Sequence, residues 1–240
     1  IPFDGNLDNL TVTLGGTRMK YNADPKDGIL SRPVDGPKDF DWNSAFGLYT
    51  LGHEFIQLRM YPNAEEKLLQ ALEQNADFLP ALTDLAMISL RNLNYEKALE
   101  YAMHALRVDT YDPAANFYYG LINARLGKLT DAKDGFDIAS LSPSGRGAAY
   151  TELSKIYLLE NDLIRAEHYA RRSLESNTLN TRAWQMIALI ARMQGDEQKA
   201  GDAVTQLEGL SPLNHFIRFE RYRTKDSQEN KAAFTGMIRN

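Results

Sequence analysis

Apolar residues recur along residues 45–212 at intervals of three, four and seven, which is the period of one face of an α-helix. Short polar turns separate consecutive helical segments at Gly127-Lys128, Asn161-Asp162 and Gly195-Asp196. Asp112-Pro113 places a capping acid directly before a first-turn proline, which is typical of a helix start. The pattern therefore predicts an all-α region made of consecutive helical hairpins.

One alanine marks a repeat within this region, because it returns at a constant interval of 34 residues. The alanines are Ala64, Ala98, Ala132, Ala166 and Ala200. Numbered with this alanine at position 20, the region divides into five units at 45–78, 79–112, 113–146, 147–180 and 181–214. A constant interval of this length indicates a stacked repeat, in which each unit buries its apolar side against its neighbours.

Further columns in the same phase indicate how such a unit packs. Position 8 is small in every unit, at Gly52, Ala86, Gly120, Ser154 and Ala188. Small residues there and at position 20 let the two helices of a hairpin approach closely, while bulky residues at positions 4 and 7 fill the surrounding space. Only Asn116 breaks the apolar rule at position 4. These columns resemble the tetratricopeptide repeat over residues 45–214, and the resemblance implies a right-handed α-α superhelix.

The two ends of the chain differ from the repeats. Residues 1–44 are rich in Gly, Pro and Asp, and their alternating pattern around Gly15-Gly16 predicts a β-hairpin followed by an extended linker. A two-residue turn at these glycines pairs Val12 with Met19. Residues 213–240 return to helical apolar spacing, which predicts a degenerate sixth repeat or capping helices that end the solenoid.

Composition removes several classes of function. The net charge of −5 and the pI of about 5.5 argue against nucleic-acid binding through the overall field of the protein. The chain has no cysteine, which excludes disulfides, thiolate nucleophiles and cysteine zinc sites. No apolar run is long enough to cross a membrane. The chain opens Ile-Pro-Phe-Asp, without an initiator methionine or a signal-peptide core, so we expect processing or a longer parent chain. The sequence does not assign the protein to a cellular compartment.

By resemblance to the family, the first helix of each unit lines a concave groove, and positions 2, 5, 9, 12 and 13 face it. The candidate peptide-binding residues are Phe46, Tyr49, His53, Met87, Arg91, Phe117, Tyr118, Leu121, Arg125, Lys155, Arg182, Gln185 and Arg192. Aromatic anchors beside Arg and Lys donors favour a protein or peptide segment with apolar and acidic side chains. The alternative is that these residues are solvated or pack between neighbouring repeats.

The carboxylate clamp that some family members use for chaperone tails does not fit this sequence. Its Lys and Asn positions in the first unit hold Tyr49 and His53, and Asp84 in the second unit would repel a carboxylate. Chemistry is equally unsupported, because the four histidines occupy four different repeat positions and no nucleotide or catalytic motif occurs. We therefore expect a protein that is not an enzyme and needs no metal or cofactor.

Three functions remain after these exclusions. The first is a scaffold that binds a partner protein or peptide in the concave groove. The second is an architectural segment of a larger protein, because the run Leu210–Phe216 is similar to repeat regions of large bacterial proteins with mutarotase-like β-sandwich domains. That similarity implies a link to carbohydrate handling. The third is self-association through the solenoid ends, or binding of residues 1–44 in the chain's own groove.

Overall fold

The fold is taken from a computed structural model, which describes residues 10–16, 19–23 and 39–224. The chain divides into two compact units, Ile1–Asp41 and Trp42–Asn240, and each is considered by itself. The first contains strands β1 (Thr11–Leu14) and β2 (Met19–Asn22), which pair antiparallel as the sequence predicts. The predicted linker falls mostly outside the described residues.

The register of this hairpin differs from the prediction. Val12 pairs with Tyr21 rather than with Met19, so the connection comprises residues 15–18 instead of two glycines. The amide of Ala23 donates to the Leu10 carbonyl at 2.8 Å, which extends the same register by one pair. A shift of two residues keeps every side chain on its predicted face, so the alternation that guided the prediction could not exclude it.

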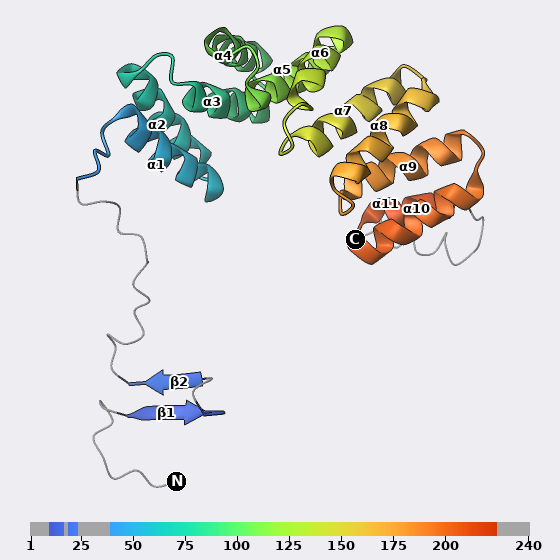
Figure 1. Cartoon of the computed structure of the whole chain (residues 1–240), viewed down its shortest axis with the longest axis horizontal. Coiled ribbons are helices and arrows are strands. Elements are labelled where there is room, and N and C mark those ends of the chain that lie inside the picture. Colours follow the sequence, from blue (N-terminus) through green and yellow to red (C-terminus); the bar gives the residue numbers. More distant parts are fainter. Residues whose placement is uncertain (1–9, 17–18, 24–38, 225–240) are drawn as a thin grey trace. The chain divides into compact units, whose positions relative to one another are not determined.

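The second unit contains eleven helices among its described residues, and they follow one another as pairs (Figure 1). The pairs are α1 (Ala45–Gln57) with α2 (Tyr61–Gln74), α3 (Leu79–Arg91) with α4 (Tyr95–Val108), α5 (Pro113–Arg125) with α6 (Leu129–Ala139), α7 (Arg146–Leu159) with α8 (Leu163–Ser176), and α9 (Thr181–Met193) with α10 (Glu197–Leu210). The all-α solenoid predicted from the repeat is confirmed. A last helix, α11 (His215–Thr224), packs on α9 and α10.

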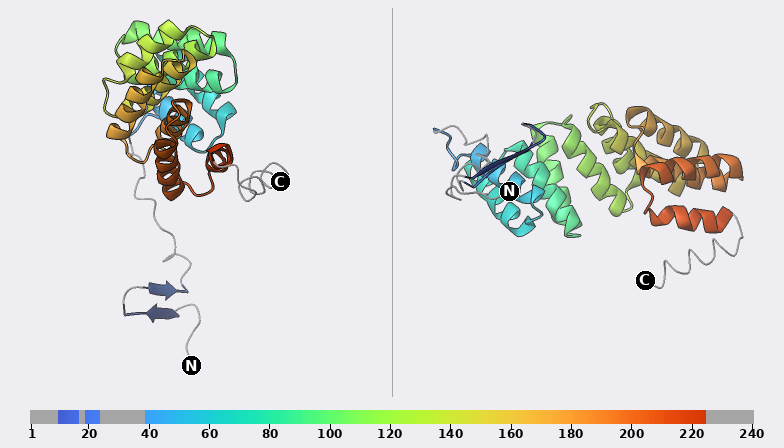
Figure 2. Two further views of the ribbon diagram at one scale, coloured as in Figure 1. Left: turned by 90° about the vertical axis from the view of Figure 1, so that its right-hand side faces the viewer. Right: turned by 90° about the horizontal axis from the view of Figure 1, so that it is seen from below.

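The stacking of the pairs gives the unit an inner layer. The first helix of each pair contacts the first helix of the next, from α1 to α3 and onward through α5, α7 and α9 (Figure 2). Each second helix also contacts the first helix of the following pair. Because α11 lies against α9 and α10 in the same manner, it takes the place that the first helix of a sixth pair would occupy.

The repeat alanines lie where the phase of the sequence places them. Ala64, Ala98, Ala132 and Ala166 are completely buried, and Ala200 is nearly so. The apolar core is divided into local clusters. One of them joins Ala86, Ala98 and Ala102 of the second repeat to Ile122 of the third repeat. Each hairpin therefore buries its apolar side against its neighbours.

Where the two helices of a pair meet, a small side chain at position 8 faces a residue at position 24. The pairs at positions 8 and 24 are Gly52 with Leu68, Ala86 with Ala102, Gly120 with Phe136, Ser154 with Ala170, and Ala188 with Val204. A methyl group added at Gly120 would lie 2.8 Å from the Phe136 ring, and one at Gly52 would lie 2.9 Å from Leu68. Glycine is thus required where the facing residue is largest.

The first helix of every pair ends in the same way. One residue adopts a positive φ at each connection, namely Arg59, Leu93, Gly127, Asn161 and Gly195. The next amide donates back to a carbonyl of the last turn, as from Asn94 to Ser89 at 2.9 Å and from Asp162 to Tyr157 at 2.8 Å. This is the Schellman pattern of helix termination. In three pairs the residue after it, Asn94, Asp162 or Asp196, caps the second helix with its side chain.

Asn116, the polar exception at position 4, is explained by the loop beside it. Its side chain is buried, and its amide donates to the carbonyls of Thr110 at 2.8 Å and Asp112 at 2.9 Å. At the same repeat position, the indole of Trp184 donates to the Thr178 carbonyl at 2.9 Å. Both side chains thus hold, by hydrogen bonds, the loop that precedes the first helix of their repeat.

Substituting Gly120 tests the balance of size between the columns. We expect Gly120→Ala to lower the free energy of unfolding by about 1–2 kcal/mol, because the new methyl overlaps the Phe136 ring. In a Phe136→Val background the same substitution should cost less, since the facing side chain is smaller. Urea unfolding of the two single variants and the double variant measures this coupling.

Gly201→Ala is the matched control for this substitution. Gly201 is also in a helix, α10, but no atom lies within 4 Å of an added methyl. Relief of the glycine penalty should therefore raise the stability of this variant by about 0.5–1 kcal/mol. Equal effects at the two positions would contradict the assigned role of Phe136.

Candidate peptide-binding surface

The first three units place an acidic centre among aromatic rings on the inner layer. Asp84 of α3 accepts a 2.8 Å hydrogen bond from Nδ1 of His53 on α1, and the His53 ring lies 5.6 Å from that of Tyr49. Burial raises the pKa of Asp84 above its ordinary value, although His53 opposes this shift. Burial, with a contribution from the Asp84 charge, also raises the pKa of Tyr49 and of Tyr118 on α5.

Four of the predicted binding residues meet in one hollow between α3 and α5. This α3–α5 hollow has a volume of about 500 Å³ and is lined by Met87, Leu90, Arg91, Leu93, Tyr95, Leu121 and Arg125. The guanidinium of Arg91 stacks over the Tyr61 ring, 4.3 Å from its centre. The resemblance to the repeat family implied Met87, Arg91, Leu121 and Arg125 as groove residues, but it did not include Leu90, Leu93 or Tyr95.

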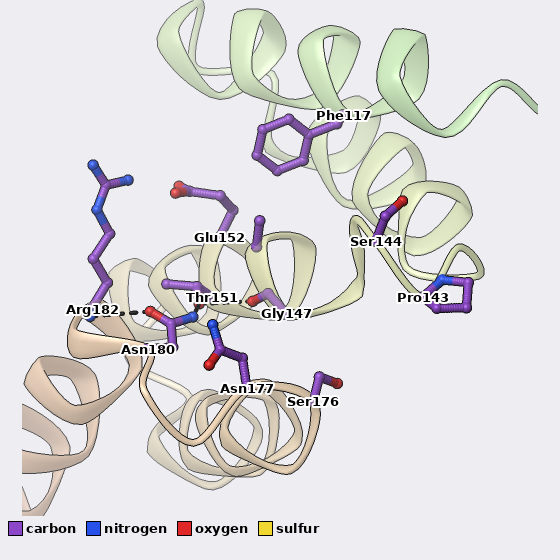
Figure 3. Close-up of a pocket in the computed structure, with 11 residues that line it drawn as sticks. Phe117, Pro143, Ser144, Gly147, Thr151, Glu152, Ser176, Asn177, Asn180 and Arg182 are labelled. Carbon is purple, nitrogen blue, oxygen red and sulfur yellow. Dashed lines mark hydrogen bonds between the residues drawn. The ribbon is translucent and has the colours of Figure 1, made fainter. Parts of the chain in front are cut away.

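A second hollow, of about 510 Å³, lies between the start of α5 and the start of α9 (Figure 3). This α5–α9 hollow is lined by Phe117, Pro143, Ser144, Gly147, Ala148, Thr151, Glu152, Ser176, Asn177, Asn180 and Arg182. Phe117 and Arg182, both predicted from the sequence, thus share one opening although they come from different units. The amide of Asn177 and the hydroxyl of Ser176 come from the end of α8, which the groove positions did not include.

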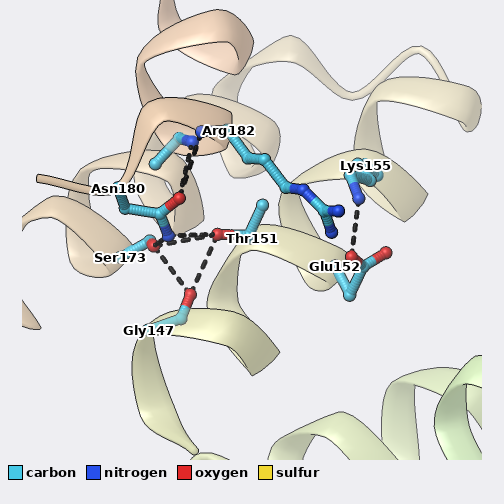
Figure 4. Close-up of polar contacts among 8 residues, drawn as sticks. Gly147, Thr151, Glu152, Lys155, Ser173, Asn180 and Arg182 are labelled. Carbon is cyan, nitrogen blue, oxygen red and sulfur yellow. Dashed lines mark hydrogen bonds and ion pairs between the residues drawn. The ribbon is translucent and has the colours of Figure 1, made fainter. Parts of the chain in front are cut away.

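A buried polar network forms the floor of the α5–α9 hollow (Figure 4). The side-chain amide of Asn180 donates to the hydroxyls of Thr151 at 2.9 Å and Ser173 at 2.8 Å. Both hydroxyls in turn donate hydrogen bonds to the Gly147 carbonyl. The side-chain oxygen of Asn180 accepts a hydrogen bond from the backbone N–H of Arg182 at 3.1 Å. The network joins α7, α8 and α9, so it fixes the position from which the Arg182 side chain extends.

Several of the predicted residues already have partners within the chain. Lys155 forms a 2.6 Å ion pair with Glu152, so its charge is shared with a neighbouring carboxylate. Arg192 pairs at 2.8 Å with Glu220 of α11, whose side chain is fully buried. Gln185 donates to the side chain of Asn214 at 3.3 Å. Arg192 and Gln185 therefore join the last pair to the α11 region.

The remaining predicted residues differ in exposure. Phe46, at the start of α1, is 57% exposed, and its ring lies 6.4 Å from that of Tyr49. Phe117 is half-buried, with its ring 5.7 Å from Phe136 and 5.9 Å from Tyr118. Arg91, Arg125 and Arg182 are exposed, and among the described residues they form no ion pair with a carboxylate. These three arginines are the cations of this surface that are open to an external acid.

The side chains of the described residues show no grouping that suggests a metal site. No three His, Asp or Glu residues within the described ranges converge as metal ligands. None of the described helices combines the length and the apolar character needed to span a bilayer.

Comparison with known proteins agrees with this architecture. The family model of the tetratricopeptide repeat matches residues 83–139. PilF of Pseudomonas aeruginosa is 18% identical, covering 80% of this chain and 87% of its own, with a TM-score of 0.71. PilW, a widely conserved type IV pilus biogenesis factor, is 19% identical, with coverages of 80% and 89% and a TM-score of 0.71.

YrrB, a tetratricopeptide repeat protein with an unusual peptide-binding site, is 13% identical to this chain. The alignment covers 74% of this chain and 92% of YrrB, with a TM-score of 0.58. The search of curated proteins gave no match. At identities this low, the structural likenesses establish the fold alone.

The stacked pairs and their inner layer define a helical-repeat solenoid protein. Residues 83–139 match the tetratricopeptide-repeat model, and the 34-residue columns continue the same pattern over residues 45–214. The resemblance drawn from the sequence is thus confirmed for the repeat family. The weaker resemblance to proteins with β-sandwich domains stays a prediction.

The raised pKa of Asp84 predicts a specific dependence of stability on pH. A carboxyl whose pKa is raised on folding stabilises the protein below its unfolded pKa, and this contribution is lost as pH rises through the folded value. Relative to wild type, Asp84→Asn should therefore become more stable as pH rises through this window. Urea unfolding between about pH 3 and pH 6 measures the difference.

Asp77→Asn is the matched control for Asp84→Asn. Asp77 also accepts a 2.8 Å hydrogen bond from a histidine, His104, but its side chain is 73% exposed, against 16% for Asp84. An equal change with pH in the two variants would contradict burial as the cause of the shift.

Proposed function

We propose that this protein is a non-enzymatic scaffold that binds a segment of a partner protein on the surface of its first helices. The observation that carries the proposal is the α5–α9 hollow, where Phe117 and Arg182 lie at one opening above a fixed polar floor. An aromatic face, a cation and amide groups together suit a peptide, because they can engage apolar side chains, carboxylates and the peptide backbone.

The state of these groups supports a binding role for the hollow. Arg182 forms no ion pair with the carboxylates of the described residues, so pairing with an external acid would break no ion pair among them. Its backbone is held by Asn180, which reduces the ordering required when a ligand binds. Glu152 is already paired with Lys155 at 2.6 Å, which lowers the repulsion of an acidic ligand.

The structural neighbours support the kind of partner without identifying it. YrrB is described as having a peptide-binding site, and PilW as a biogenesis factor of the type IV pilus. Both have the fold of this chain, so a protein or peptide partner is consistent with its architecture. An architectural role in a longer protein linked to carbohydrate handling stays a prediction from the sequence.

Charge reversal at Arg182 tests this proposal. We would select peptides from a phage-displayed random library against the wild-type chain and measure their affinities by fluorescence polarisation. Arg182→Glu should weaken acidic peptides bound in the α5–α9 hollow by about tenfold or more, because an attractive contact becomes repulsive. Circular dichroism should show unchanged helical content, since the Arg182 side chain is exposed.

Arg107→Glu supplies the control with the same change of charge. Arg107 is also exposed, but it lies in the last turn of α4, a second helix, and lines neither hollow. Its substitution should leave peptide affinity within about twofold of wild type, because it removes no contact at the site. Failure to select any peptide, or equal losses in the two variants, would refute the proposal.

A further inference from the structure

Leu93 occupies a conformation that its side chain does not favour. Its φ is +61°, in the left-handed region, where the Cβ atom of an L-residue crowds its own backbone. Two of the five corresponding positions hold glycine, Gly127 and Gly195, and a third holds Asn161, a residue that tolerates this region. The remaining two positions hold Arg59 and Leu93, which do not favour this region, and Leu93 is the apolar one of the two.

The fold recovers little of this cost through burial. The Leu93 side chain is 70% exposed, so most of its apolar surface stays in water. Backbone strain of this kind is typical of residues kept for a function, and it is informative only where an outlier is actually observed. Here the outlier lies at the edge of the α3–α5 hollow, whose wall it helps to form.

The surroundings of Leu93 indicate what the hollow can hold. Met87 and Leu90 of α3 and Leu121 of α5 line it with apolar surface, while Arg91 and Arg125 add two guanidinium groups. Neither arginine forms an ion pair with a carboxylate of the described residues. Arg91 is held over the Tyr61 ring at 4.3 Å, which orients its charge beside the apolar surface. An apolar pocket with two uncompensated cations is complementary to an apolar side chain flanked by acids.

We propose that the α3–α5 hollow is a docking pocket for an acidic peptide segment, into which one large apolar side chain of that segment inserts. Leu93 contacts that side chain and is retained in its strained conformation for this contact. Arg91 and Arg125 pair with carboxylates on either side of it. The inference rests on the proposed peptide-binding function, but it concerns a different hollow and different residues from Arg182.

The proposal gives the substitution Leu93→Asn two effects of opposite sign. Asparagine relieves the backbone strain, as at Asn161, so the thermal midpoint should rise by roughly 2–4 °C. Loss of the apolar contact should weaken peptide binding by about tenfold. Differential scanning calorimetry and fluorescence polarisation measure the two effects on the same protein. A lower thermal midpoint, or unchanged affinity, would overturn the assigned role of Leu93.

Arg59→Asn is the matched control, because Arg59 has the corresponding conformation in the first unit, with φ of +60°. It lines neither the α3–α5 nor the α5–α9 hollow. The control should also raise the thermal midpoint, since it relieves the same strain, while leaving peptide affinity unchanged. A loss of binding in this variant would show that the affinity of Leu93→Asn reports the helix connection rather than the pocket.

The probe is an array of short synthetic peptides with one central residue and matched flanks. Leucine, phenylalanine or alanine stands at the centre, and aspartate, asparagine or lysine stands on both sides. Peptides with a large apolar centre and aspartate flanks should bind best, and Arg91→Gln with Arg125→Gln should abolish the preference for aspartate over asparagine. A preference for lysine flanks, or indifference to the central residue, would overturn the proposal.

Arg182→Glu separates this inference from the proposed function. If the array peptides bind and only Arg182→Glu weakens them, peptide binding stands and the assignment to the α3–α5 hollow is wrong. If no array peptide binds while library peptides do, the predicted ligand chemistry is wrong. If neither set of peptides binds, the proposed function and the further inference both fail.

Discussion

The close contact between the two helices of each hairpin is the constraint on which the rest of the structure depends. Ala64 and its four counterparts are buried at this contact, and a methyl group at Gly120 would overlap the Phe136 ring. A hairpin packed this closely still has apolar surface that only a neighbouring hairpin can cover. The stack, its inner layer and the surface exposed on that layer all follow from this need.

Much of this could be predicted from the sequence, because the same contact recurs with every unit. The alanine column fixed the phase, and the small residues at position 8 indicated which helices meet. The hairpin register could not be fixed in the same way, since pairing Val12 with Met19 or with Tyr21 preserves the two faces equally well. Periodicity is thus informative about a repeated contact and ambiguous about a single one.

The candidate surface was harder to predict for a related reason. Arg91 and Arg125 follow from their repeat positions, but Leu93 enters the α3–α5 hollow through a turn whose backbone conformation the sequence does not display. Asn180 and Ser173 come from segments outside the predicted groove, and they meet Thr151 only because the loop folds back. The ion pair of Arg192 with Glu220 depends on a helix beyond the fifth unit. Each of these contacts occurs in one repeat only, so no recurring column of the sequence predicts it.

The inner layer has a mechanical consequence. Among the described residues, each helix packs against helices of its own pair and of the neighbouring pairs, so the geometry of the array is set at each junction between successive pairs. A small rotation at each joint accumulates along the series and changes the curvature of the lining. The array can therefore change its curvature around a long ligand, with the energy of the deformation distributed over all the junctions between pairs.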